Sequence, residues 1–365
     1  MGNKLISVTK TYLPPLEEFV SELEKIWESG WITNNGQLSR ELSKRLRDYL
    51  SVENLELVAN GTLALQLAIK ALKLNGEIIT TPFSYVATTT AILWEGCDPV
   101  FVDIEDKTFC IDADKIESAI TDQTSAILAT HVYGYPCNVE KIELISEKYG
   151  LKVIYDAAHA FRVRLKGKSL MSYGDVSALS LHATKLFHTA EGGALITNDS
   201  ELAEKIFLMK KFGHIGESDY RQLGINAKMS ELHAALGLCV LPKVDQLIAY
   251  RKRIFDRYEE NLHGAPIVRP IIPEELDYNY AYYPIVLQTE KLMEQLQEEL
   301  TNNDIMPRRY FHPSLNTLHY LESRLRISCP VSESISSRVL CLPVYYGLEL
   351  EEVDRISDLV VRVLK

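Results

Sequence analysis

Two charged residues, Asp156 and Lys185, occur in sequence contexts where their side chains could do chemistry. Asp156 ends the apolar run KVIYD and is followed by AAHA, so its carboxylate is expected at the carboxyl edge of a strand, where α/β folds bind ligands. A carboxylate beside a pyridine nitrogen keeps that nitrogen protonated, as a pyridine cofactor requires for accepting electrons. A strand-end aspartate also commonly caps the next helix, and Asp156 alone does not separate the two interpretations.

Lys185 lies in the segment SLHATKLFHTAEGGA, a turn rich in small and polar residues between two apolar runs. A lysine in a turn is usually exposed and has no catalytic role, so its position alone indicates little. The flanking strands change this expectation, because an amine that lines a desolvated pocket loses its proton more readily and can then form an imine. Lys185 is therefore a candidate nucleophile.

Several other residues have types and positions that suit a phosphorylated ring cofactor. Gly61 and Thr62 open a helix directly after a strand, where free backbone N–H groups and the helix dipole favour a phosphate. Ser180 could add a hydroxyl to the same phosphate. Tyr85 could stack on the ring, and His159 could bond its phenolic oxygen. The structural alternatives are an N-cap, a satisfied strand hydroxyl, a core aromatic and a packed histidine.

The elements that must position these residues alternate along the chain. Helical patterns separate short β-rich runs, which predicts an α/β fold with a mainly parallel sheet covered by helices on both faces. Two further runs, 176–181 and 193–198, are too close together for a helical crossover, so they should pair side by side with Lys185 in their turn. The earlier β-rich runs are 55–59, 77–81, 99–104, 125–131 and 152–156.

The length of 365 residues exceeds what a single core usually supports, so two domains are expected. The region around Pro242 is the best candidate for their boundary, which gives a large domain over 1–242 and a small C-terminal domain over 243–365. The segment from 200 to 244 is predicted to be helical. The small domain is predicted to contain a strand at 282–288 and helices near 290–303 and 349–365.

Charge and composition argue against several classes of partner. The net charge of −11, without a cluster of Lys and Arg, argues against nucleic acid. No stretch reaches the roughly 18 apolar residues of a membrane span, and the start of the chain lacks the pattern of a signal peptide. The six cysteines are scattered without metal-ligand spacing, which favours reduced thiols and no bound metal. We therefore expect a cytoplasmic protein.

Taken together, these segments resemble the DegT/DnrJ/StrS family of sugar aminotransferases, which are pyridoxal-phosphate enzymes of fold type I, the aspartate aminotransferase fold. The resemblance implies a large domain with a mainly parallel sheet and a smaller α/β C-terminal domain. Its most specific part is Ser-x-His-x-x-Lys at 180–185 followed by Glu-Gly-Gly-Ala at 191–194. Supporting motifs are NGTLAL at 60–65, TPFSYVAT at 81–88, DAAHA at 156–160 and GINAKMSELHAALG at 224–237.

The resemblance also implies roles for individual residues. Lys185 matches the Schiff-base lysine, which favours transamination over the dehydration performed by members with histidine there, and pyridoxamine phosphate would be the intermediate form of the cofactor. Asp156 matches the partner of the pyridinium nitrogen. Asn226 matches an asparagine that reaches the phosphate from the neighbouring subunit, which implies a homodimer with shared active sites. The remaining cofactor contacts would be Gly61, Thr62 and Ser180 at the phosphate, Tyr85 on the ring and His159 near the phenolic oxygen.

One position departs from the family pattern. Lys228 stands where the family usually has arginine, so a bidentate contact with an anion becomes a single-point contact or is lost.

Of the adjacent Arg308 and Arg309, at most one should face the pocket, because neighbours on an extended segment point in opposite directions. The candidates for substrate contact are Trp31, Thr33, His188, Tyr310 and His312.

Three segments have sequences most similar to those of family members that convert dTDP-4-keto-6-deoxyglucose to dTDP-4-amino-4,6-dideoxyglucose. These members use glutamate as the amino donor, and their product is used for surface polysaccharide such as O-antigen. These segments are WITNNG, TPFSYVATTTAILWEG and HATKLFHTAEGG. Members that aminate carbon 3 of a dTDP-3-keto-6-deoxyhexose share most of the same motifs, so this alternative stays open.

Two functions from other classes fit the sequence less well. A nicotinamide-dependent sugar oxidoreductase would need the G-x-G-x-x-G turn after its first strand, and this chain has NGT there. A non-catalytic regulator with the same fold would have no need of both Asp156 and Lys185. An aminotransferase is therefore the favoured function.

Overall fold

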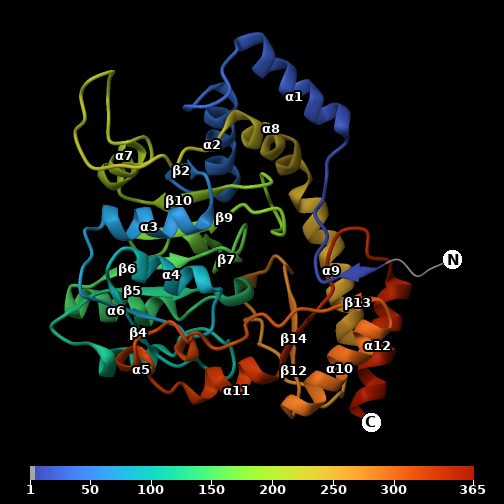
Figure 1. The fold of residues 1–365 in the computed structure, drawn as a ribbon. Helices are drawn as coiled ribbons and strands as arrows, with labels where there is room; N and C mark the ends of the chain where they lie inside the picture. Colours follow the sequence, from blue (N-terminus) through green and yellow to red (C-terminus); the bar gives the residue numbers. More distant parts are fainter. Residues whose placement is uncertain (1–4) are drawn as a thin grey trace.

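The computed structural model describes residues 5–365, and its core is a seven-stranded sheet with helices on both faces (Figure 1). In spatial order the strands are β2 (Asn54–Val58), β10 (Gly193–Thr197), β9 (Val176–Ser180), β6 (Lys152–Asp156), β5 (Thr124–Thr130), β3 (Glu77–Thr80) and β4 (Asp98–Phe101). Strand β10 runs antiparallel to both of its neighbours, and the other paired strands are parallel. The predicted mainly parallel sheet is thus confirmed.

Alternate positions of the strands face two different cores, one on each side of the sheet. In β5, Ala126 and Leu128 belong to one core, and Ile127 and Ala129 belong to the other. Burial on both faces explains why these strands are nearly continuous apolar runs. The first core is completed by α3 (Gly61–Ala71), α4 (Val86–Trp94) and α7 (Ser200–Met209), and the second by α2 (Gln37–Leu50), α5 (Ala113–Ile116), α6 (Val139–Tyr149) and α8 (Glu231–Val240).

The pairing of β9 with β10 places the segment 181–192 at the edge of the sheet where parallel strands end. Gly193 lies opposite Ser180 in this antiparallel pair, and Lys185 is in the connecting segment, as predicted. The glycines after the lysine are needed here. A side chain on Gly193 would lie 2.5 Å from the backbone carbon of Asn60, so only glycine allows the connection to pass the start of α3.

The C-terminal part packs helices around a short antiparallel pair, β12 (Tyr283–Val286) and β14 (Val339–Leu342). The start of the chain joins this part, because β1 (Ile6–Ser7) pairs in parallel with β13 (Ile305–Met306) (Figure 1). The remaining elements are α1 (Leu16–Ser29), α9 (Val244–Asn261), α10 (Glu290–Asn302), α11 (Pro330–Arg338), α12 (Leu350–Leu364) and the small sheet of β11 (Leu276–Asp277), β7 (Arg164–Leu165) and β8 (Lys168–Ser169).

Pro242 lies in a 3-10 turn, Leu241–Lys243, that joins α8 directly to α9. The division into two domains at this point stays a prediction. Together the three elements form one helical stretch, Glu231–Asn261, that is long and apolar enough to cross a membrane by length and composition alone. Half of its most apolar window is buried inside the protein, which is also how a core helix of a globular enzyme behaves.

The prediction of helix throughout 200–244 is wrong in its middle. Helix α7 ends at Met209 and α8 begins at Glu231, and the intervening loop extends away from the sheet in Figure 1. The loop folds back on itself through isolated bridges, one of which joins Lys211 and Asn226. Gly213, with a φ of +77°, adopts a left-handed conformation that interrupts a helix.

Candidate active site

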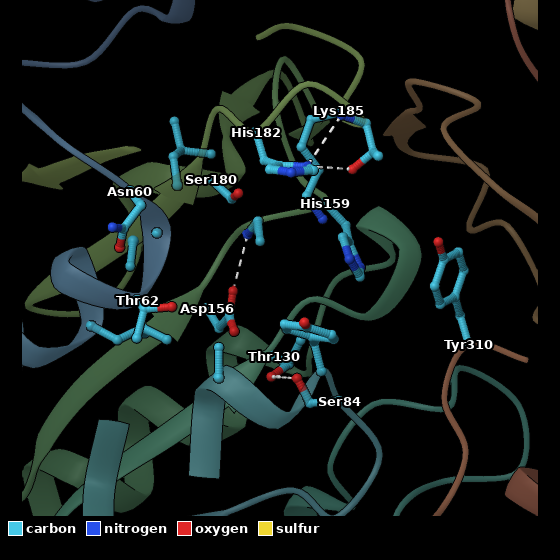
Figure 2. A pocket seen from close by; sticks show the side chains of 18 of the residues that line it. Asn60, Thr62, Ser84, Thr130, Asp156, His159, Ser180, His182, Lys185 and Tyr310 are labelled. Atoms are coloured by element: carbon cyan, nitrogen blue, oxygen red, sulfur yellow. Dashed lines mark hydrogen bonds between the residues drawn. The ribbon is translucent and has the colours of Figure 1, made fainter. Parts of the chain in front are cut away.

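A cavity of about 430 Å³ lies where the central strands end and the C-terminal part covers them (Figure 2). Its walls come from the start of α3, the segment before α4, the end of β6, the turn after β9 and the segment around residue 310. Eight of the predicted cofactor and substrate residues line it, although they come from distant parts of the chain. These residues are Gly61, Thr62, Tyr85, Asp156, His159, Ser180, Lys185 and Tyr310.

Asp156 is 6% exposed at the end of β6, and both of its carboxylate oxygens are hydrogen bonded. Oδ1 accepts from the backbone N–H of Ala158 at 3.1 Å, and Oδ2 accepts from the hydroxyl of Thr88 at 2.8 Å. Burial raises the pKa of this carboxyl group, and the two hydrogen bonds and the charge of Lys185 oppose the increase. No helix follows Asp156, so it is not a helix cap, and its carboxylate is directed to the cavity.

Lys185 is half-buried in the cavity, where its Nζ donates to the hydroxyl of Tyr282 at 3.4 Å. Burial lowers the pKa of this amine to about 8, although the negative charge of Asp156 acts in the other direction. About a tenth of the amine is therefore unprotonated at pH 7, and this is the form that nucleophilic attack on a carbonyl carbon requires.

The first turn of α3 and the end of β9 form one side of the cavity. Asn60 caps the helix, its side chain accepting from the N–H of Leu63 at 2.8 Å. The N–H groups of Gly61 and Thr62 have no acceptor within the helix and are available to an anion. A side chain on Gly61 would lie 3.0 Å from the Cβ of Ser180, so the helix start and the serine are in close contact.

His159 is buried, and its Nδ1 accepts from the backbone N–H of Tyr133 at 3.1 Å. Burial holds the pKa of this imidazole well below its ordinary value, so the ring is neutral. Because Nδ1 is an acceptor, the proton of the neutral ring is assigned to Nε2. The ring lies parallel to Phe311, with centroids 5.5 Å apart, which fixes its orientation at the cavity wall.

These groups fit a pyridine ring that carries a phosphate and a phenolic oxygen. A buried carboxylate can face the ring nitrogen, an amine of lowered pKa can bind the carbonyl carbon, and a helix start with a neighbouring hydroxyl can hold the phosphate. The exposed ring of Tyr85, at the entrance to α4, is free to stack on such a ligand.

Other predicted residues do not line this cavity. Trp31 and Thr33 are exposed between α1 and α2, and Trp31 lines a second cavity together with Lys228. Asn226 is exposed, and its side-chain oxygen accepts from Lys228 Nζ at 2.6 Å. Within one chain, therefore, Asn226 does not reach the phosphate side of the cavity.

The two histidines predicted as substrate contacts are also placed elsewhere. His188 is 1% exposed, and both of its ring nitrogens have backbone partners, the N–H of Ala190 and the carbonyl of Tyr12. The connecting segment turns this side chain inward, where it ties the N-terminal segment to the lysine turn. His312 is exposed and lies beside Arg309, with Arg309 Nη2 at 3.1 Å from its Nδ1.

Among the residues without a role assigned from the sequence, three bear on the chemistry of the cavity. Thr88 contacts Asp156, Tyr282 contacts Lys185, and Arg308 lines the cavity. Arg309 points away and donates to the carbonyls of Ser336 and Ser337, so only one of the two arginines faces the cavity, as expected. Tyr282 and Lys185 are 97 residues apart, and no local pattern indicates their contact.

Comparison with known proteins agrees with this geometry. The model of the DegT/DnrJ/EryC1/StrS aminotransferase family matches residues 16–361. The chain is 43% identical to the dTDP-4-amino-4,6-dideoxy-D-glucose transaminase of Escherichia coli, over 98% of this chain and 99% of the relative. It is 32% identical to the dTDP-3-amino-3,6-dideoxy-alpha-D-galactopyranose transaminase of Aneurinibacillus thermoaerophilus, over 95% of each chain.

A solved structure, DesI in the presence of its TDP-sugar product, superposes with a TM-score of 0.94 at 30% identity and covers 99% of this chain and 93% of that one. The family match, the relatives and this structure each extend over nearly the whole chain, so the likeness includes both the central sheet and the C-terminal part. The predicted family is confirmed, and this chain belongs to the DegT/DnrJ/EryC1/StrS aminotransferases.

Proposed function

We propose that this chain transfers an amino group from glutamate to carbon 4 of dTDP-4-keto-6-deoxyglucose and so forms dTDP-4-amino-4,6-dideoxyglucose for surface polysaccharide. The observation that carries the choice of sugar is the 43% identity, over nearly the full length, to a transaminase named for this product. The relative named for a 3-amino sugar is less similar, at 32% identity. We place the reaction in the cytoplasm.

The cofactor is pyridoxal phosphate, as predicted, because the chain is an aminotransferase of this family and its cavity fits the group. When bound, pyridoxal phosphate supplies a carbonyl carbon for the amino group and a ring that accepts electrons. Nζ of Lys185 would hold it covalently. Gly61, Thr62 and Ser180 would hold its phosphate, and the Nε2–H of His159 would donate to its phenolic oxygen.

Lys185 also has a second task in this proposal. Its Nζ would act as a base towards the α-carbon of glutamate and later as an acid towards carbon 4 of the sugar. An amine with a pKa of about 8 can do both near neutral pH. The carboxylate of Asp156 would keep the ring nitrogen of the cofactor protonated.

The substrates would enter from the side of the cavity lined by Arg308 and Tyr310. An arginine suits a carboxylate of the donor because its guanidinium can donate two parallel hydrogen bonds. Arg308 is therefore our candidate for binding a carboxylate of glutamate, a contact to which no residue was assigned from the sequence.

The identity of the sugar can be tested with a panel of substrates. The purified protein, loaded with pyridoxal phosphate, is incubated with glutamate and with dTDP- and UDP-linked 3-keto and 4-keto 6-deoxyhexoses, and the products are identified by mass and NMR. We expect amination of the dTDP-linked 4-keto sugar at carbon 4 and formation of 2-oxoglutarate. Preferential amination of a 3-keto sugar would instead support the carbon-3 alternative. A protein that stays colourless when pyridoxal phosphate is added, and that reacts with none of the sugars, would support a regulator.

We also propose that the enzyme is a homodimer in which Asn226 reaches the phosphate site of the partner. Two observations support this: Asn226 is exposed and outside the cavity of its own chain, and the loop that carries it extends away from the sheet with exposed apolar side chains. These side chains are Phe212, Ile215, Tyr220, Leu223 and Ile225. Apolar groups gathered on one loop favour burial against another protein surface.

Complementation between two inactive variants tests this arrangement. Lys185→Ala and Asn226→Ala subunits are mixed, dissociated and reassociated, and activity is measured at limiting cofactor. Each heterodimer then has one site with both substitutions and one site with neither. Because half of the dimers in an equal mixture are heterodimers, the mixture should recover about a quarter of normal activity. A fully active Asn226→Ala variant, or a mixture that is no better than its parents, would contradict the shared site.

A further inference from the structure

Three buried hydroxyl groups form a chain of hydrogen bonds that ends on Asp156. The chain starts at the end of β5, where Thr130 Oγ1 donates to Ser84 Oγ at 3.0 Å (Figure 2). Ser84 Oγ is 2.7 Å from Thr88 Oγ1, and Thr88 Oγ1 donates to Asp156 Oδ2 at 2.8 Å. All three hydroxyl residues are at most 2% exposed, and Thr88, which contacts the carboxylate, is fully buried, whereas Ser84 and Thr130 also line the cavity.

The carboxylate fixes the direction of each proton in this chain. An ionised aspartate can only accept, so the single proton of Thr88 points at Oδ2. Thr88 must then accept from Ser84, and Ser84 accepts from Thr130. In such a one-way chain each hydroxyl polarises the next, which strengthens the last hydrogen bond to the carboxylate.

The position of Asp156 explains why this hydrogen bond matters. Burial raises the pKa of the carboxyl group, and the contact that opposes this most is the hydrogen bond from Thr88, ahead of the N–H of Ala158 and the charge of Lys185. The other titratable groups beside it are neutral, because burial lowers the pKa of His159 and raises that of Tyr282. Thr88 is therefore the main side-chain donor that keeps Asp156 ionised.

We propose that Thr88 is a positioning residue for amino transfer, supported by Ser84 and Thr130. Its hydrogen bond occupies Oδ2 and keeps the carboxylate charged and in one orientation, so that Asp156 presents a fixed negative charge to the ring nitrogen of the cofactor. The inference rests on the proposed role of Asp156. It adds that three hydroxyl groups, from Thr130 at the end of β5 and from Ser84 and Thr88 near the start of α4, keep Asp156 charged and oriented.

The chain offers a matched control in the next residue. Thr89 is also fully buried, on the same helix, but its hydroxyl has no hydrogen-bond partner among the described residues. Thr88→Val and Thr89→Val make the same isosteric change at two adjacent buried positions. Only the first removes a hydrogen bond to a carboxylate, so a difference between the variants reports on that bond and not on packing.

The first readout uses the protein without cofactor. Infrared difference spectra across a pH series measure the protonation of Asp156, identified by the band that Asp156→Asn removes. We expect Thr88→Val to raise the pKa of Asp156 by about 1, which is about a tenfold change in its proton affinity. Ser84→Ala should raise the pKa less, because the last hydrogen bond remains, and Thr88→Ser should restore the normal value. Thr89→Val should leave it unchanged.

The second readout uses the protein with pyridoxal phosphate bound. For Thr88→Val we expect a changed pH dependence of the visible cofactor band and about a tenfold lower kcat with little change in KM for the sugar. An Asp156 pKa that is the same in Thr88→Val and Thr89→Val would overturn the proposal, whichever sugar is the substrate. A wrong choice of sugar appears only in the substrate panel, so the two failures can be told apart.

Discussion

Replacing Lys185 with alanine is expected to lower kcat by about 10⁴-fold or more, the upper end of what a positioned acid–base group contributes, and to leave the fold intact. The side chain lies in the cavity rather than in either core of the sheet, so its removal disturbs little packing. Asp156 and the start of α3 remain in place, so the cofactor should still bind, without a covalent link. Single-turnover assays with glutamate, with circular dichroism to check the fold, measure both parts of this expectation.

Lys185→Arg separates the chemistry of the amine from its charge. Arginine keeps a positive charge near Asp156, but its guanidinium does not give up a proton at neutral pH and cannot act as nucleophile or base. We expect Lys185→Arg to be as inactive as Lys185→Ala, and borohydride to fix the cofactor to neither variant. If either variant turned over at a near-normal rate, the assignment of Lys185 would be wrong.

The strands, and the direct pairing of two of them, could be predicted because their signals are local. Each buried strand is an apolar run of a few residues, and the close spacing of the runs that became β9 and β10 required a direct pairing. The predicted site residues that line the cavity also lie next to such elements. Gly61 starts a helix after a strand, and Asp156 ends a strand, so the topology of the sheet brings them to one edge.

Residues that depend on side-chain direction could not be predicted in the same way. His188 is three positions from Lys185 in the sequence, yet its turn points it inward to the carbonyl of Tyr12. The contact between Lys185 and Tyr282 depends on how the C-terminal part covers the sheet. The segment after α7 was predicted to be helical, but in the structure it is a loop with several exposed apolar side chains, among them Phe212 and Leu223.

Two aspartates show where the sequence is ambiguous. Asp103 follows a buried apolar strand and Asp156 ends another, and by sequence either could be a helix cap or a site residue. In the structure Asp103 accepts from the N–H groups of Val331 and Ser332 at the start of α11, both at 2.9 Å, whereas Asp156 lines the cavity. The partner of Asp103 comes from a segment more than two hundred residues away, which no local pattern reveals.

Replacing Asp156 with asparagine is expected to lower kcat by about 10²- to 10³-fold, as removal of one preorganised electrostatic contact typically does. Asparagine has nearly the same shape, and its oxygen can still accept from Ala158, so the fold and the phosphate site should persist. The negative charge is lost, and the ring nitrogen of the cofactor then gives up its proton more easily. The loss of activity should therefore grow as the pH rises, because fewer molecules keep that proton.

Asp103→Asn provides the matched control for this prediction, because it makes the same change at another strand-end aspartate that is 7% exposed. It weakens a helix cap and should lower the free energy of unfolding by about 1 kcal/mol, with kcat and its pH profile unchanged. Asp156→Asn should show the reverse, a changed pH profile and visible spectrum with a small effect on unfolding. Equal effects of the two substitutions on kcat would mean that Asp156 acts through the fold, and its charge would then have no special role at the ring nitrogen.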